Sequence, residues 1–195
     1  MLSRLRKLSL ALPALLAVLA LSACGDSHTR VTTGTYAGES GANAPYLNVG
    51  PLIYEVQLSR ELNPYDTEDA NYLQGLSEAE RHLEAGQEWF GVFIQVYNNS
   101  SSPQPAASAL TVSDTAGNTY TPLTLVQTNQ FAYRGGQVPA KEQLPQPGSV
   151  AAAGPTQGAL LLYKIKIASL DNRPLTIKIV DPTDPTQTAS AELDV

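Results

Sequence analysis

Three acidic side chains stand close together near the middle of the chain, and carboxylate oxygens are the ligands that calcium prefers. They are Asp66, Glu68 and Asp69. An EF-hand loop starting at Asp66 would place Asn71 where glycine is required and Ser77 where a bidentate glutamate is required, so this template fails. The three carboxylates are therefore weak candidates for an irregular metal site, and the simpler interpretation is a solvated acidic loop. We expect no cofactor.

Residue types that support catalysis are scarce. The chain has two histidines, His28 and His82, so a Ser-His-Asp triad in the folded part would depend on His82. No serine lies in a Gly-x-Ser-x-Gly motif, and the glycine-rich phosphate-binding motifs are missing. A carboxylate pair acting on a glycoside, Asp66 or Glu68 with Asp114, stays open. We expect a protein that is not an enzyme.

The single cysteine, Cys24, follows an apolar segment. Residues 1–7 carry three cations, and residues 8–21 form an apolar run of 14 residues, shorter than the roughly 20 that span a bilayer. The chain then reads Leu21-Ser22-Ala23-Cys24, which resembles the lipobox of bacterial lipoproteins. The resemblance implies cleavage after Ala23, a diacylglyceryl thioether on Cys24 and an acyl group on the new amino terminus. The alternative is an ordinary secretory signal.

This reading divides the chain into three parts. Residues 1–23 are expected to be a lipoprotein signal peptide, residues 24–45 a lipid-anchored flexible tether rich in Gly, Ser and Thr, and residues 46–195 the folded domain. The protein would be anchored to the cell membrane through Cys24, on the extracytoplasmic face. After residue 23, nine Lys and Arg stand against eighteen Asp and Glu, and this negative charge disfavours a nucleic-acid partner.

Alternating apolar residues predict that the folded part consists mainly of β-strands. A capping box at Ser77 and Glu80 predicts one short helix over 78–85. Because the strands are short and separated by turn residues, the sequence predicts an all-β, antiparallel β-sandwich. The expected strands and hairpin cover residues 52–59, 88–98, 110–120, 123–127, 149–153, 159–167, 175–179 and 188–194.

The strand at 88–98 is apolar on both faces, so both faces need cover. One face carries Phe90, Val92, Ile94 and Val96, and the other carries Trp89, Phe93 and Tyr97. The segment 61–87 offers apolar residues that would lie over the aromatic face, namely Tyr65, Tyr72, Leu73, Leu76 and Leu83. In the alternative, that face stays open and binds a sugar, a peptide or a partner protein.

The irregular segment 128–148 supplies a second set of candidate binding residues, Phe131, Tyr133 and Arg134, because long loops in compact domains are often functional. Simple packing of this loop onto the sheet is the other reading.

Three further features resemble the immunoglobulin-like extracellular domains of uncharacterised bacterial lipoproteins. They are the strand ending at Asn98, the hairpin Leu110 to Tyr120, and Pro147-Gly148 before an apolar strand. The resemblance implies an immunoglobulin-like sandwich outside the cytoplasm, and it carries over no catalytic residue. Two functions follow: a non-catalytic binding module for a protein or envelope polymer, or a structural accessory subunit of an envelope complex. A module should expose a concave site, and an accessory subunit a flat apolar patch.

Overall fold

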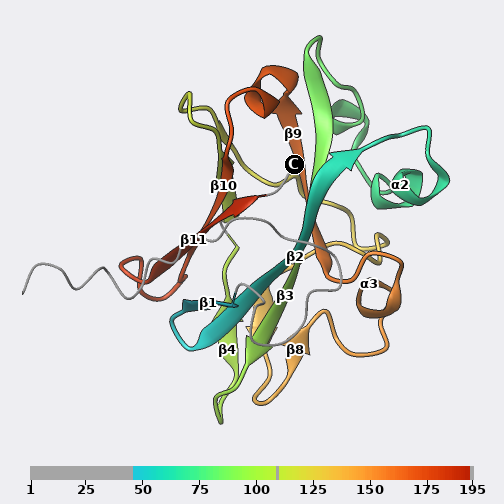
Figure 1. Cartoon of the computed structure of the whole chain (residues 1–195). Helices are drawn as coiled ribbons and strands as arrows, with labels where there is room; N and C mark the ends of the chain where they lie inside the picture. The colour runs from blue at the N-terminus through green and yellow to red at the C-terminus, as the bar shows by residue number, and fades with distance from the viewer. Residues whose placement is uncertain (1–45, 109, 194–195) are drawn as a thin grey trace, which may run out of the picture.

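The computed structural model describes residues 46–108 and 110–193, and these form two antiparallel β-sheets that pack face to face (Figure 1). The expected signal peptide and tether, with Cys24, lie outside the described residues. In the first sheet the strands follow the order β1 (Tyr46–Val49), β2 (Leu52–Leu62), β3 (Gln87–Asn98), and then β9 (Ala159–Lys166) and β8 (Gln143–Leu144), which pair with successive parts of β3. In the second sheet the order is β11 (Thr188–Leu193), β10 (Leu175–Val180), β5 (Leu110–Ser113) and β6 (Thr119–Tyr120).

Shorter elements connect these sheets. Strands β4 (Gln104–Ala106) and β7 (Gly136–Val138) form a two-stranded ribbon. The helices are α2 (Thr67–Tyr72) and α3 (Val150–Ala153), with 3₁₀ turns at Glu78–Glu80 and Ile167–Leu170. The fold is an all-β sandwich, as the sequence predicts.

The main hydrophobic core lies between the two sheets. Phe90, Val92, Ile94 and Val96 of β3 all face this core and are fully buried, which confirms the face predicted for them. They meet alternate residues of the second sheet, including Val112, Ile177 and Ala191. Removal of this apolar surface from water is the main force that holds the sheets together.

A β-bulge in β2 sends side chains to both faces of the first sheet. Val56 lies opposite Ile94 and Leu58 opposite Phe93, so Gln57 is the extra residue. Because side chains alternate along a strand, the extra residue reverses the faces beyond it. Val56 accordingly joins the core between the sheets, and Leu58 and Leu62 join a second core on the outer face of the first sheet.

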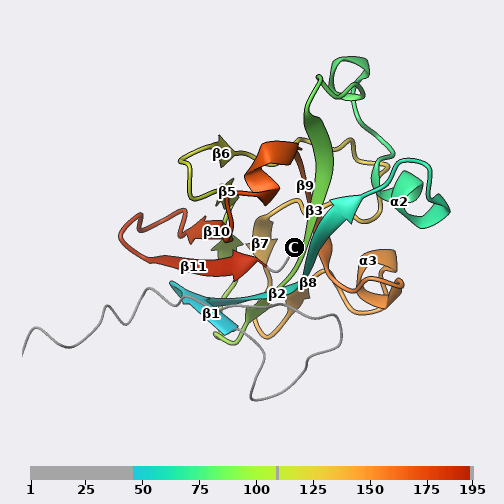
Figure 2. The ribbon, with the colours of Figure 1, turned by 45° about the horizontal axis from the view of Figure 1, so that its top comes forward.

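The second core is covered by a third layer, which Figure 2 shows as α2, α3 and the chain around them on the far side of β3 from the second sheet. It contains Leu62, Trp89, Phe93, Leu160 and Leu162 of the sheet, with Tyr72, Leu76 and Leu125 from outside it. The molecule is thus a sandwich with an irregular outer layer on one side.

Three predicted elements are wrong. Residues 123–127 form no strand, and residues 149–153 contain helix α3. Ser149 caps that helix, since its hydroxyl accepts a hydrogen bond from the amide of Ala152, and alanine is the best helix former.

The predicted helix over 78–85 is only a 3₁₀ turn at Glu78–Glu80, whose cap at Ser77 does form. The longer helix of this segment is α2. The side chain of Asp66 caps α2 by accepting hydrogen bonds from the amides of Glu68 and Asp69.

Candidate functional site

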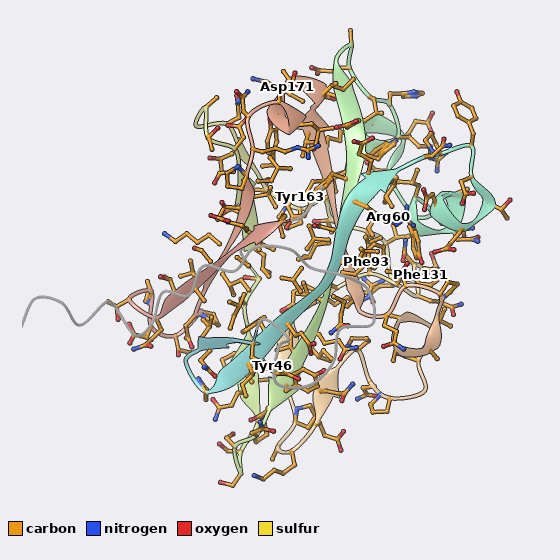
Figure 3. All side chains as sticks on the ribbon, in the orientation of Figure 1. Tyr46, Arg60, Phe93, Phe131, Tyr163 and Asp171 are labelled. Carbon is orange, nitrogen blue, oxygen red and sulfur yellow. The ribbon has the colours of Figure 1, made fainter. Side chains whose placement is uncertain are left out.

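The aromatic face of β3 is closed. Trp89 is 4% exposed and Phe93 is fully buried, because the outer layer lies over them. The ring of Tyr72 meets Phe93 edge to face with 5.0 Å between ring centroids, and it meets Phe131 in the same way at 4.8 Å. Figure 3 labels Phe93 and Phe131 in the region between the first sheet and the outer layer. The interpretation of Trp89 and Phe93 as an open binding platform is therefore wrong, because both are core residues.

The cover comes largely from the predicted residues. Tyr72 and Leu76 are buried in the second core, and Leu73 and Leu83 pack against it. Tyr65 does not take part, since it is 96% exposed. The remaining cover comes from Leu125 and Phe131 in the segment before β7, which the sequence patterns did not assign to this face.

Tyr97 lies apart from the other two aromatic residues, near the opposite end of β3. Its hydroxyl donates to the carboxylate of Glu55 at 2.9 Å and contacts the side-chain oxygen of Gln95. Burial, together with the negative charge of Glu55, raises the pKa of Tyr97 above its ordinary value. The Tyr97 hydroxyl therefore contacts side chains of the first sheet itself. Tyr97 does not form one surface with Trp89 and Phe93.

The three acidic candidates have structural partners. Asp66 caps α2, as described above. Asp69 accepts two hydrogen bonds from the guanidinium of Arg60, at 2.5 and 3.0 Å, and a third from the amide of Asn63. Glu68 accepts from the hydroxyls of Tyr72 and Thr156. Among the residues the structure describes, no group of three or more His, Cys, Asp or Glu side chains is placed to hold a metal ion.

The ion pair changes the acidity of Asp69. Burial opposes ionisation, but the hydrogen bonds from Arg60 and Asn63 outweigh it, so the pKa of Asp69 lies below its ordinary value. Asp69 is thus ionised at neutral pH and joins α2 to β2.

The other predicted residues lie together on one loop, residues 122–135. Phe131 packs against Tyr72 and is partly buried. The hydroxyl of Tyr133 donates to the carbonyl of Ala107 at 2.7 Å, and burial raises the pKa of Tyr133 well above its ordinary value. The guanidinium of Arg134 donates to three carbonyls of its own loop, those of Leu125, Val126 and Asn129, at 2.8 to 3.2 Å.

Asn129 is the residue of this loop that sequence reasoning missed. It is 4% exposed, and its amide group donates to the carbonyls of Tyr72 and Gln74 while its oxygen accepts from the amides of Phe131 and Ala132. Asparagine in an irregular segment often bonds the backbone two residues on, which is the local signal that was present. The contacts to residues 72 and 74 have no such local signal.

The backbone of the loop is also tied to the first sheet. Phe131 and Tyr133 exchange hydrogen bonds with Leu160 of β9, and the amide of Leu123 donates to Leu162. These bonds cover part of the outer edge of β9. The loop is therefore fixed at several points, although it has almost no regular secondary structure.

Three hollows flank this loop. The first, about 240 Å³, is lined by residues that include Asn71, Gln74, Thr128, Asn129, Gln130 and Phe131. The second, about 260 Å³, includes Gln130, Tyr133, Arg134, Leu144, Gln146 and Ser149. The third, about 280 Å³, includes Ser108, Thr124, Gln127, Tyr133, Arg134 and Leu160. We call the loop and these hollows the loop surface.

Comparison with known proteins gives the fold and little more. No protein-family model matches the sequence, and no curated protein matches it. Among solved structures, the yjhA protein of Bacillus subtilis is similar, with a TM-score of 0.50 and 10% sequence identity over 83% of this chain and 100% of that chain. At this identity the likeness concerns the fold alone.

Two other solved structures align less closely. One is ycdA of Bacillus subtilis, described as a candidate lipoprotein, with a TM-score of 0.44 and 11% identity over 80% of this chain and 39% of that chain. The other is an uncharacterised β-sandwich protein of Clostridium difficile, with a TM-score of 0.43 and 9% identity over 84% of this chain and 96% of that chain.

None of the helices in the described part of the chain is long and apolar enough to cross a bilayer.

Proposed function

We propose that this protein is a lipid-anchored, extracytoplasmic lipoprotein whose β-sandwich acts as a non-catalytic binding module. The lipid on Cys24 holds it at the cell membrane, and the loop surface contacts the ligand. The observation that carries this proposal is the loop 122–135, which is fixed in place and bordered by three hollows.

The fixed loop supports a binding role because a preorganised surface loses little conformational entropy when it binds. Arg134 and Asn129 together make seven hydrogen bonds to backbone groups. These bonds join the loop to itself and to the C-terminal end of α2. The exposed side chains between them, such as Gln130, are therefore presented in a constant arrangement.

The surroundings of His82 support the absence of catalysis. It is the one histidine of the described residues and its side chain is 80% exposed. The carboxylate nearest to it, that of Glu78, lies 3.9 Å away and is equally exposed. A catalytic histidine normally needs a partner that orients it and a site that excludes water, and neither is present around His82.

The exposed hydrophobic side chains favour a module over an accessory subunit. Among the described residues, the large ones are Tyr65, Val126, Val150 and Ile167. Val126 belongs to the loop 122–135 and Val150 lines the first hollow, whereas Tyr65 and Ile167 lie on other segments. A permanent subunit interface needs a contiguous apolar area of several hundred Å². The loop surface instead combines Val126 and Val150 with polar side chains such as Gln130 around its hollows.

Photocrosslinking in intact cells tests this proposal. A photoreactive amino acid in place of Gln130 puts the probe on the loop surface, and the same residue in place of Lys178 puts it on the outer face of the second sheet as a matched control. We expect a crosslinked product from position 130 and none from position 178. Equal products from both positions, or a product from position 178 alone, would show that the loop surface is not the contact site.

A further inference from the structure

The three hollows differ from the rest of the molecule in charge. The chain has eighteen Asp and Glu, and eight of them lie in residues 61–88, where Arg81 is the one Lys or Arg. Asn71 and Gln74 of the first hollow come from this acidic segment. Even so, no Asp, Glu, Lys or His lines any of the three hollows.

Arg134 is the one cation among the lining residues, and most of its N–H donors are already engaged. Its guanidinium donates to three backbone carbonyls of the loop, which leaves few donors for a ligand. Because an anionic polymer needs several free cations, the loop surface is poorly suited to one.

The exposed polar side chains in the hollows are mainly carboxamides and hydroxyls. Asn71, Gln74 and Gln130 line the first hollow, and Gln130 and Gln146 line the second. A carboxamide offers both donors and acceptors. A sugar hydroxyl also donates and accepts, so the two groups are complementary, and neither carries a charge.

Aromatic side chains add apolar surface to the same hollows. Phe131 lines the first, and Tyr133 lines the second and third. An aromatic ring buries a large apolar area at low entropic cost, and it suits the C–H face of a pyranose ring. Each hollow thus combines an aromatic ring with neutral polar groups.

The hollows also adjoin one another. The first shares Gln130 with the second, and the second shares Tyr133 and Arg134 with the third. Such a series suits an extended ligand with repeating units. A peptide recognised as an added strand would need an open strand edge, but the edge of β9 beside the third hollow is already bonded to Leu123, Phe131 and Tyr133.

From these observations we infer that the loop surface binds a neutral, hydroxyl-rich polysaccharide. This inference rests on the proposed binding function and gives the ligand its chemical class. Because the contacts are uncharged, binding should change little with salt concentration.

The test is calorimetric titration of the purified protein with neutral hexasaccharides of glucose, mannose and N-acetylglucosamine. We expect at least one of them to bind, with an affinity unchanged between about 50 mM and about 500 mM salt. The double variant Gln130→Ala with Gln146→Ala should weaken binding about ten-fold, which corresponds to the loss of one or two hydrogen bonds.

The matched control is Gln137→Ala, an exposed glutamine on β7 outside the three hollows, and it should bind as the parent does. Binding of an acidic hexasaccharide or of a peptide in preference to all the neutral sugars would overturn the inference, as would a failure of every neutral sugar to bind. If position 130 still crosslinks a partner in cells in that case, the binding module stands and only the ligand class is wrong.

Discussion

Single residues hold the parts of the outer layer together, and Asn129 is the clearest case. Its buried side chain satisfies two carbonyls at the C-terminal end of α2, those of Tyr72 and Gln74, and two amides of the loop. Arg134 holds the same loop through three carbonyls, those of Leu125, Val126 and Asn129. The arginine that we expected to contact a ligand thus acts mainly by positioning the loop that carries the hollows.

Substitution Asn129→Ala should lower the free energy of unfolding by about 2 to 4 kcal/mol, because buried backbone groups that lose their partners cost about 1 to 3 kcal/mol each. Urea titration followed by circular dichroism measures this change. The control Asn99→Ala removes an exposed asparagine and should cost less than about 0.5 kcal/mol. Equal losses in the two variants would contradict the structural role of Asn129.

At the scale of elements, the segment between β2 and β3 serves as cover for the outer face of the first sheet. The bulge at Gln57 turns Leu58 and Leu62 toward that face, and Tyr72 closes it over Phe93. The outer face of the first sheet is apolar because a second hydrophobic core forms on it.

Substitution Phe93→Ala should destabilise the protein by about 3 to 5 kcal/mol, since it leaves a cavity under Tyr72. Tyr65→Ala, in the same covering segment but 96% exposed, should have almost no effect. Thermal unfolding of both variants measures the difference. If Phe93→Ala melts as the parent does, the aromatic face is not a core.

The ion pair between β2 and α2 makes a pH-dependent contribution to stability. The pKa of Asp69 is lower in the folded protein than its unfolded value of about 3.9. The contribution is therefore complete above about pH 5 and is lost as the pH falls through the lower, folded-state pKa.

The free energy of unfolding should accordingly fall less steeply below about pH 4 in Asp69→Asn than in the parent. Exposed Asp171 provides the control, because Asp171→Asn should leave the slope unchanged. Urea titrations at several pH values give these slopes, and parallel curves for Asp69→Asn and the parent would rule out this contribution.

At the scale of the whole molecule, the sandwich fold and the proposed lipid anchor have different roles. The fold presents the loop surface, and the anchor would keep that surface at a membrane. Two acyl chains suffice for stable anchoring, since each buried methylene contributes about 0.8 kcal/mol. The net negative charge of residues 24–195 gives no electrostatic attraction to anionic lipids.

Substitution Cys24→Ala should release the protein from membranes into the soluble fraction, as measured by fractionation and immunoblotting. A high-salt wash of the parent is the control, because a lipid anchor should resist it. Retention of Cys24→Ala on washed membranes would contradict anchoring through this cysteine.

The sequence by itself determined most of the sandwich. Alternation identified β2, β3, β9, β10 and β11, because the two-residue period of a half-buried strand is a local property. Turn chemistry located the hairpin of β5 and β6 in the same way. The capping box likewise identified Ser77 as a helix cap, although the helix that follows it is a single 3₁₀ turn.

Only the tertiary structure decided which surface is free. Trp89 and Phe93 read equally well as a binding platform or as core, since a strand with two apolar faces does not reveal what lies over it. The answer depends on Tyr72, Leu125 and Asn129, and Tyr72 lies more than fifty positions from the other two in the sequence. They come together only when the chain is folded. The loop surface follows from the same contacts, because hydrogen bonds between residues more than fifty positions apart leave no period or motif in the sequence.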